Sequence, residues 1–133
     1  MVILSFNRSH QVLLARVSGI FASSDMADLD TAVIRFLAQR AGEAELRALY
    51  DFSEVEAIAV PASKFAERGR QPPIVKGLRV LVAPAGAGEN FGTAFRNQQG
   101  IAGNTEPQVV ASLSDAYTLL GLHDPVFEPV EQS

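Results

Sequence analysis

Two short apolar runs open the chain and are separated by four turn-forming residues. Residues 2–6 and residues 11–17 are rich in Val, Ile and Leu, as β-strands commonly are. The Asn-Arg-Ser-His segment between them has the length and composition of a hairpin turn. We therefore predict an antiparallel hairpin at the start of the chain. Its second strand should end before Gly19, where the apolar pattern breaks.

The next apolar positions recur at the spacing of one face of a helix. They are Met26, Leu29, Val33, Phe36 and Leu37. Ser23 or Ser24 can accept a hydrogen bond from the free amides that open this helix, and Gly42 is the expected stop. The pattern predicts one amphipathic helix between these residues.

From residue 46 onward, short apolar strands alternate with helical segments. Strands are predicted over residues 46–50, 78–83 and 108–111, and helices over residues 61–68, 90–98 and 113–120. Such alternation is typical of a largely parallel sheet. We therefore predict one α/β domain over residues 1–122, in the order β-β-α-β-α-β-α-β-α, with a mainly parallel sheet entered by the antiparallel hairpin. Residues 123–133 are expected to form a mobile tail.

The composition narrows the class of protein. A chain of 133 residues with 47% hydrophobic residues suits one packed domain. It contains no cysteine, which excludes a thiolate nucleophile, a disulfide and a cysteine-ligated metal. The formal net charge is −4 and the basic residues are scattered, which argues against nucleic-acid binding. No apolar run is long enough for a membrane helix and no basic signal region opens the chain, so we expect a cytoplasmic protein without membrane insertion.

Parallel sheets place their sites at the carboxyl ends of the strands, and the predicted strand over residues 46–50 leads directly to Asp51. An aspartate at such a position could accept a phosphoryl group. That chemistry needs further carboxylates to hold Mg²⁺ and a lysine, and the neighbouring predicted loops do not offer them. We therefore interpret Asp51 as a side-chain cap of the turn after its strand.

A glycine-rich segment, residues 86–92, follows the predicted strand over residues 78–83. Its place before a helix is typical of a phosphate-binding loop, but Glu89 puts negative charge where a phosphate would lie. We interpret the segment as a connecting loop. His10 and His123 are far apart in sequence, and no nucleophile elbow is present. We therefore expect no catalytic residues, no metal site and no cofactor.

Three segments resemble the STAS superfamily, in particular its SpoIIAA-like group of bacterial proteins related to anti-sigma-factor antagonists. Residues 49–55 are similar to that family's strand-end pattern, residues 91–96 to the start of its third helix, and residues 114–121 to its closing helix. The order of the predicted elements agrees along nearly the whole chain. The resemblance implies a STAS-like fold and a bacterial, cytoplasmic, regulatory protein that binds a protein partner.

In the antagonists that this group resembles, the strand-end motif is followed by a serine that a partner kinase phosphorylates. Ala59 and Val60 stand at the corresponding place in this chain, with Ser53 and Ser63 on either side. The chain therefore lacks the usual phosphoacceptor serine. The resemblance still implies a partner-binding surface over residues 53–65.

The first hypothesis of function is a protein-interaction module. Its partner-binding residues would be Asp51, Ser53, Glu54, Ser63, Lys64 and Arg68. Lys64 and Arg68 are four positions apart, which puts them on one face of the predicted helix. There they would either supply charge complementary to a partner or form an ordinary solvated face.

The second hypothesis is a carrier of a small apolar or anionic ligand, since lipid-carrying Sec14-like domains share this fold type. Small residues would allow a ligand to approach closely in a pocket between residues 83–91 and residues 51–60. The ligand-binding residues would be Gly86, Gly88, Phe91 and Arg96, the last of which would anchor an anionic head group.

A homodimer is also expected from the first hairpin. One of its two strands is expected at a sheet edge, where unpaired amides and carbonyls favour pairing with another chain. Neither strand carries the inward lysine or the proline that would blunt such an edge. The alternative is a monomer whose own tail covers the hairpin through Val126, Phe127 and Val130.

Overall fold

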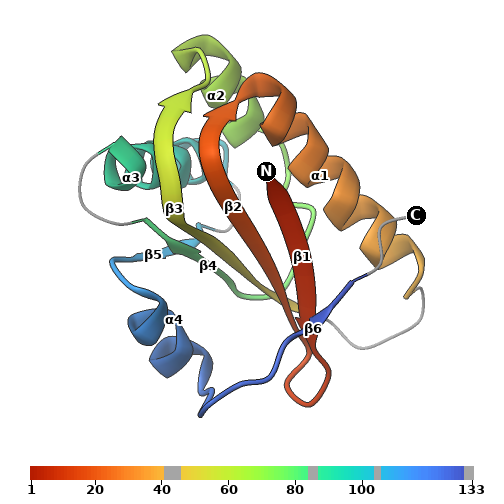
Figure 1. Cartoon of the computed structure of the whole chain (residues 1–133). Coiled ribbons are helices and arrows are strands. Elements are labelled where there is room, and N and C mark those ends of the chain that lie inside the picture. The colour runs from red at the N-terminus through yellow and green to blue at the C-terminus, as the bar shows by residue number, and fades with distance from the viewer. Residues whose placement is uncertain (41–45, 84–86, 104–105, 131–133) are drawn as a thin grey trace.

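The computed structural model describes residues 1–40, 46–83, 87–103 and 106–130, which form one sheet with helices on both faces (Figure 1). The strands are β1 (Val2–Asn7), β2 (Val12–Ala22), β3 (Arg47–Ala59), β4 (Arg79–Val82), β5 (Gln108–Val110) and β6 (Glu128–Pro129). The helices are α1 (Ser23–Ala38), α2 (Ala62–Gly69), α3 (Ala87–Ile101) and α4 (Leu113–Leu120). The predicted α/β class and the predicted order of the first nine elements are confirmed.

The strands lie in the order β5-β4-β3-β2-β1-β6. The pairs β2–β3, β3–β4 and β4–β5 are parallel, whereas β1 is antiparallel to both of its neighbours. The Asn7 side chain closes the hairpin turn, because its Oδ1 accepts a hydrogen bond from the His10 amide at 2.8 Å. A mainly parallel sheet entered by an antiparallel hairpin is therefore confirmed.

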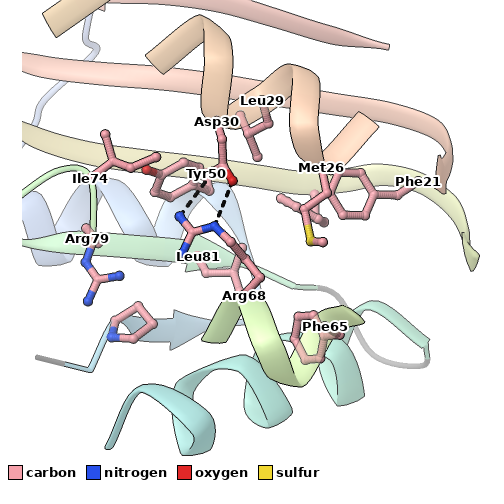
Figure 2. A pocket seen from close by; sticks show the side chains of 12 residues that line it. Phe21, Met26, Leu29, Asp30, Tyr50, Phe65, Arg68, Ile74, Arg79 and Leu81 are labelled. Atoms are coloured by element: carbon pink, nitrogen blue, oxygen red, sulfur yellow. Dashed lines mark hydrogen bonds and ion pairs between the residues drawn. The ribbon is translucent and has the colours of Figure 1, made fainter. Parts of the chain in front are cut away.

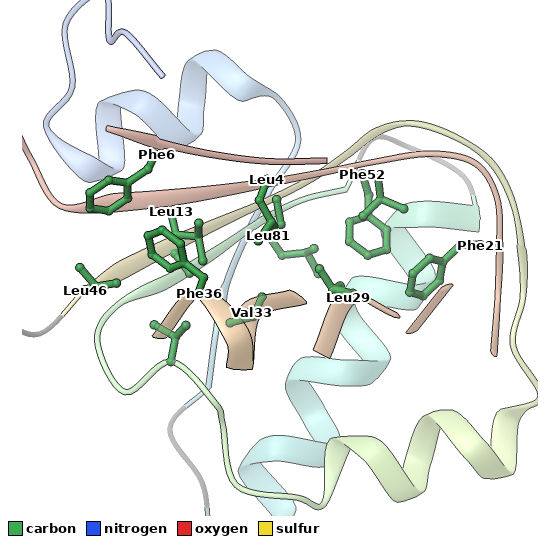
Figure 3. Packing of buried hydrophobic residues seen from close by; sticks show 14 of the residues in the cluster. Leu4, Phe6, Leu13, Phe21, Leu29, Val33, Phe36, Leu46, Phe52 and Leu81 are labelled. Atoms are coloured by element: carbon green, nitrogen blue, oxygen red, sulfur yellow. The ribbon is translucent and has the colours of Figure 1, made fainter. Parts of the chain in front are cut away.

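The larger hydrophobic core lies between the sheet and α1. The buried residues of α1 are Leu29, Val33 and Phe36, which belong to the face that the helical spacing predicts. Phe36 packs against Phe6 of β1 with 5.1 Å between the ring centroids (Figure 3). A smaller cluster covers the opposite face of the sheet, where α4 packs against β3 and β4. The central strands β2, β3 and β4 therefore contribute alternate residues to two cores.

β2 and β3 run further than the sequence pattern predicts. The pattern ends them before Gly19 and at residue 50, but their pairing continues to Ala22 and Ala59. The register shifts twice along β2, and Gly19 lies at the second shift with a φ of +77°. Glycine adopts this conformation without strain. The break expected at Gly19 therefore lies within a continuous strand and is not a strand end. It faces a bulge in β3, where one extra residue falls between the paired positions Val55 and Ala57.

Local capping signals place α4 as predicted. The Ser112 hydroxyl accepts a hydrogen bond from the Asp115 amide at 3.1 Å, and Gly121 closes the helix in the left-handed conformation.

The start of α1 differs from the prediction. Ser23 is its first helical residue, and the Ala22 amide donates instead to the Asp25 carboxylate at 2.8 Å. α1 ends at Ala38 with Gln39 as its C-cap, earlier than the stop expected at Gly42, which itself lies outside the described residues. Among the described helices, none is both long and apolar enough to cross a membrane.

α3 begins at Ala87, three residues before the predicted start at residue 90, and it ends at Ile101. Most of the glycine-rich segment is therefore helical instead of forming a connecting loop. The C-terminal segment also differs from expectation, because Glu128 and Pro129 pair with β1 as strand β6. The Val130 amide donates to the Leu4 carbonyl at 3.0 Å. The expected mobility of this segment stays a prediction.

Candidate functional site

The outer end of β3 and the helix α2 that follows it form the surface on which most of the expected partner-binding residues lie (Figure 1). Its exposed polar side chains are Ser53, Glu54, Glu56, Ser63, Lys64 and Glu67. We call these six residues the β3–α2 surface. Ala59 ends β3 and half-buried Val60 follows it, so neither position between the two elements offers a hydroxyl group.

Asp51 precedes this surface along β3 and is 1% exposed. Its Oδ2 is 3.3 Å from Arg16 Nε, and its Oδ1 accepts a hydrogen bond from the Ser53 amide at 2.9 Å. The strand continues past Asp51, so the side chain does not cap a turn at a strand end. The Asp51 side chain bonds instead to the backbone of a β-bulge. At this bulge β3 has one more residue than β2 between two successive paired positions. Asp51 therefore supports the local backbone and holds Arg16.

Arg68 and Lys64 are placed differently despite their spacing of four residues. Lys64 is exposed, whereas the Arg68 guanidinium donates two hydrogen bonds to the Asp30 carboxylate of α1, at 2.7 and 3.1 Å. The side chains of Arg68 and Asp30 are 19% and 29% exposed. A bidentate pair of this kind is directional as well as attractive. Arg68 therefore ties α2 to α1, and Lys64 remains on the β3–α2 surface.

Gln99 of α3 fixes the end of α2, and no sequence pattern predicts it. The side chain is fully buried. Its Nε2 donates to the carbonyls of Gly69 and Gln71, the latter at 2.9 Å, and its Oε1 accepts a hydrogen bond from Arg79 at 3.0 Å. A Cβ atom on Gly69 would lie 2.5 Å from Gln98 Cβ, so glycine is what allows α2 and α3 to approach this closely. One amide thus joins α2, the connector after it and β4.

A cavity of about 70 Å³ lies under α2, between α1 and the sheet. Its lining is mostly apolar and includes Phe21, Met26, Leu29, Phe65, Ile74 and Leu81. The polar groups that line it come from Asp30, Tyr50, Arg68 and Arg79. In Figure 2 the Asp30–Arg68 pair lies in the middle, with Arg79 on one side of it and Met26, Phe21 and Phe65 on the other. The cavity therefore has a polar end and an apolar end.

Burial changes the pKa values of Tyr50 and Arg79, the two polar groups beside the Asp30–Arg68 pair. Desolvation raises the pKa of the Tyr50 hydroxyl to about 12, although the charge of Arg79 opposes the shift. Desolvation also lowers the pKa of Arg79 from its ordinary value, with Tyr50 acting in the opposite direction. Tyr50 is therefore a neutral hydrogen-bond donor at neutral pH.

The expected ligand-binding residues are not brought into this cavity. Gly86 lies outside the described residues, and Gly88 and Phe91 lie in α3, where the structure describes only their backbone. Arg96 lies half-buried on the same helix. Phe52 is the lining residue that comes from the two segments expected to frame a pocket. Across the described part of the chain, no three His, Asp or Glu side chains gather as metal ligands would.

Comparison with known proteins places this arrangement in a recognised fold. No protein-family model matches the chain, and no curated protein matches it. The chain is similar to the solved structure of the anti-sigma factor antagonist SpoIIAA in its unphosphorylated form, with a TM-score of 0.52 and 11% sequence identity. The match covers 89% of this chain and 94% of that chain. The STAS-like, SpoIIAA-like fold implied by the sequence resemblance is therefore confirmed.

Proposed function

We propose that this chain is a non-catalytic, cytoplasmic regulatory module that binds a protein partner through the β3–α2 surface. The likeness to an anti-sigma factor antagonist along nearly the whole length of both chains supports this function. The single observation that supports this location of the binding site is the exposure of four polar residues on β3 and α2, namely Ser53, Glu54, Ser63 and Lys64. The hydrogen bonds of Arg68 and Gln99 hold α2 in position. A surface whose backbone elements are already held in place favours specific recognition, because little backbone entropy is lost on binding.

The exposure and contacts of the residues expected to bind the partner support different proposed roles for them. Ser53, Glu54, Ser63 and Lys64 are exposed and would touch the partner directly. Asp51 is buried and Arg68 is engaged with Asp30, so these two would act by holding β3 and α2 in place. A variant of Lys64 therefore tests contact, whereas a variant of Arg68 would also disturb the fold.

Affinity capture from cells that naturally express the chain tests the proposal. Lys64→Glu reverses a charge on the β3–α2 surface, and Lys76→Glu makes the same change at an exposed position beyond the opposite end of β3. We expect a protein that the wild type and Lys76→Glu both retain and that Lys64→Glu loses. If every protein captured by the wild type is also captured by Lys64→Glu, the β3–α2 surface is not the binding site.

Carriage of a small ligand is the second candidate function, and the cavity under α2 is the observation that favours it. The cavity is far larger than the 10–15 Å³ or so that one water needs, and close-packed interiors contain few such spaces. It lies under α2 instead of between the loops that the sequence indicates. Retention of a small molecule by gently purified protein, detected by native mass spectrometry, would support this function.

Homodimerisation remains a further proposal. Within the described residues, β6 pairs only with Ser5 and Phe6, while Ile3 of β1 is 53% exposed. The edge strand β6 is two residues long, which leaves little backbone for pairing with a second chain. A dimer would therefore need the exposed Ile3 side chain of β1 as well as the sheet edge.

A further inference from the structure

The cavity under α2 has a chemical character that indicates which ligands it would hold. Its apolar end is formed by Phe21, Met26 and Phe65, and its polar end by Tyr50 and Arg79 (Figure 2). Binding sites for small molecules are commonly built this way, with an apolar lining that supplies affinity and a few polar groups that fix orientation. A ligand that matches both ends must be amphipathic.

The formal charges of the lining residues favour an anion. Asp30 contributes one negative charge, Arg68 and Arg79 contribute one positive charge each, and Tyr50 is neutral. The lining therefore carries one positive charge in excess. In a partly desolvated site this excess attracts a monoanion more strongly than it would in water. A carboxylate could accept hydrogen bonds from the Tyr50 hydroxyl and from a guanidinium at the same time.

The size of the cavity limits the apolar part of the ligand. An engineered protein cavity of about 150 Å³ binds benzene, and this one is about 70 Å³. A short branched or linear hydrocarbon group would fit without movement of the surrounding elements. A ligand with a longer hydrocarbon chain would require α2 to move outward. That movement would break the Asp30–Arg68 pair and the hydrogen bonds of Gln99.

We propose that this cavity binds a small organic monoanion, namely a carboxylate on a short apolar body. The carboxylate lies at Tyr50 and Arg79, and the body lies against Phe21, Met26 and Phe65. This inference rests on the second candidate function, ligand carriage, and names its ligand class and its site. It is independent of partner binding through the β3–α2 surface.

Isovalerate and isovaleramide are the probes, because they share one hydrocarbon body and differ in the charge of the head group. Each is titrated into isotope-labelled full-length protein, and binding is followed by NMR at the arginine side-chain N–H groups and the tyrosine rings. We expect isovalerate to bind about tenfold more tightly than isovaleramide, since a charged acceptor forms stronger hydrogen bonds. Shifts should appear at Arg79 and Tyr50.

Tyr50→Phe removes only the hydroxyl group, and Tyr117→Phe makes the same change on α4 as a matched control. We expect Tyr50→Phe to weaken isovalerate binding by about tenfold and to leave isovaleramide binding less affected, while Tyr117→Phe changes neither. Equal affinity of the wild type for both probes would overturn the anion class while leaving ligand carriage standing. Binding of neither probe would overturn the inference and remove the support for ligand carriage. The relative affinities of the wild-type protein for isovalerate and isovaleramide test the preference for an anion even if the Tyr50→Phe variant does not fold.

Discussion

Replacement of Gln99 by methionine tests whether one buried amide fixes the position of α2. The two side chains are similar in length, so the substitution removes hydrogen bonds with little change of volume. Gln99 makes three of them, to the carbonyls of Gly69 and Gln71 and to the Arg79 guanidinium. At about 1 kcal/mol for each bond, the loss is about 3 kcal/mol. Placing an apolar side chain against these polar groups raises the expected cost to about 3–5 kcal/mol.

Urea denaturation followed by circular dichroism measures this loss as a change in the free energy of unfolding. Asn97→Met is the matched control, because Asn97 is an exposed amide on the same helix. We expect the control to change the free energy of unfolding by less than about 0.5 kcal/mol, as surface substitutions usually do. A cost below about 1 kcal/mol for Gln99→Met would refute the reasoning, because α2 would then be held by other contacts.

Three further predictions concern the ties between elements. A double-mutant cycle on Asp30 and Arg68 should give a coupling energy of about 1–2 kcal/mol, because the pair is bidentate and partly buried; a coupling near zero would mean that it does not hold α2 to α1. Truncation after Leu122 removes β6 and leaves the backbone edge of β1 unpaired, so light scattering should show increased self-association. An unchanged molecular mass would mean that the exposed edge of β1 does not promote pairing between chains. Tyr50 should form tyrosinate only near pH 12, as measured by ultraviolet absorbance. The unfolded chain loses this proton near pH 10.0, so the free energy of unfolding should fall between these values; titration of Tyr50 near pH 10.0 in the folded protein would contradict its burial.

The elements that sequence predicts well are those with local signals. The apolar spacing of Leu29, Val33 and Phe36 depends only on the geometry of a helix. The start and stop of α4 depend on Ser112 and Gly121, each within four residues of the groups it satisfies. These signals need no knowledge of the rest of the chain. For the same reason the α/β order could be predicted from the sequence.

The outer half of β3 could not be predicted this way. Residues 53–59 are mostly exposed, with Val55 and Ile58 only partly buried, so they lack the apolar alternation of a strand. They are extended because β2 pairs with them across two register shifts. The strand is therefore a consequence of tertiary pairing instead of local preference.

The contacts that build the site join residues far apart in the sequence. Arg68 and Asp30 are 38 positions apart, and Gln99 and Gly69 are 30 positions apart. Nothing local distinguishes Gln99, which is buried, from Gln98 beside it. The spacing of Lys64 and Arg68 suggests one shared face, but α1 supplies a carboxylate that Arg68 reaches and Lys64 does not. The cavity likewise depends on side chains from separate elements that only the fold brings together.

Site-specific photo-crosslinking in living cells tests the central claim most directly. A photoreactive amino acid replaces Ser63 on the β3–α2 surface in one variant and Lys76, beyond the opposite end of β3, in another. If the chain is a regulatory module that docks a partner through the β3–α2 surface, the first variant yields one dominant crosslinked protein and the second does not yield it. Equal crosslinking at both positions, or no crosslinked protein at position 63, would contradict the account.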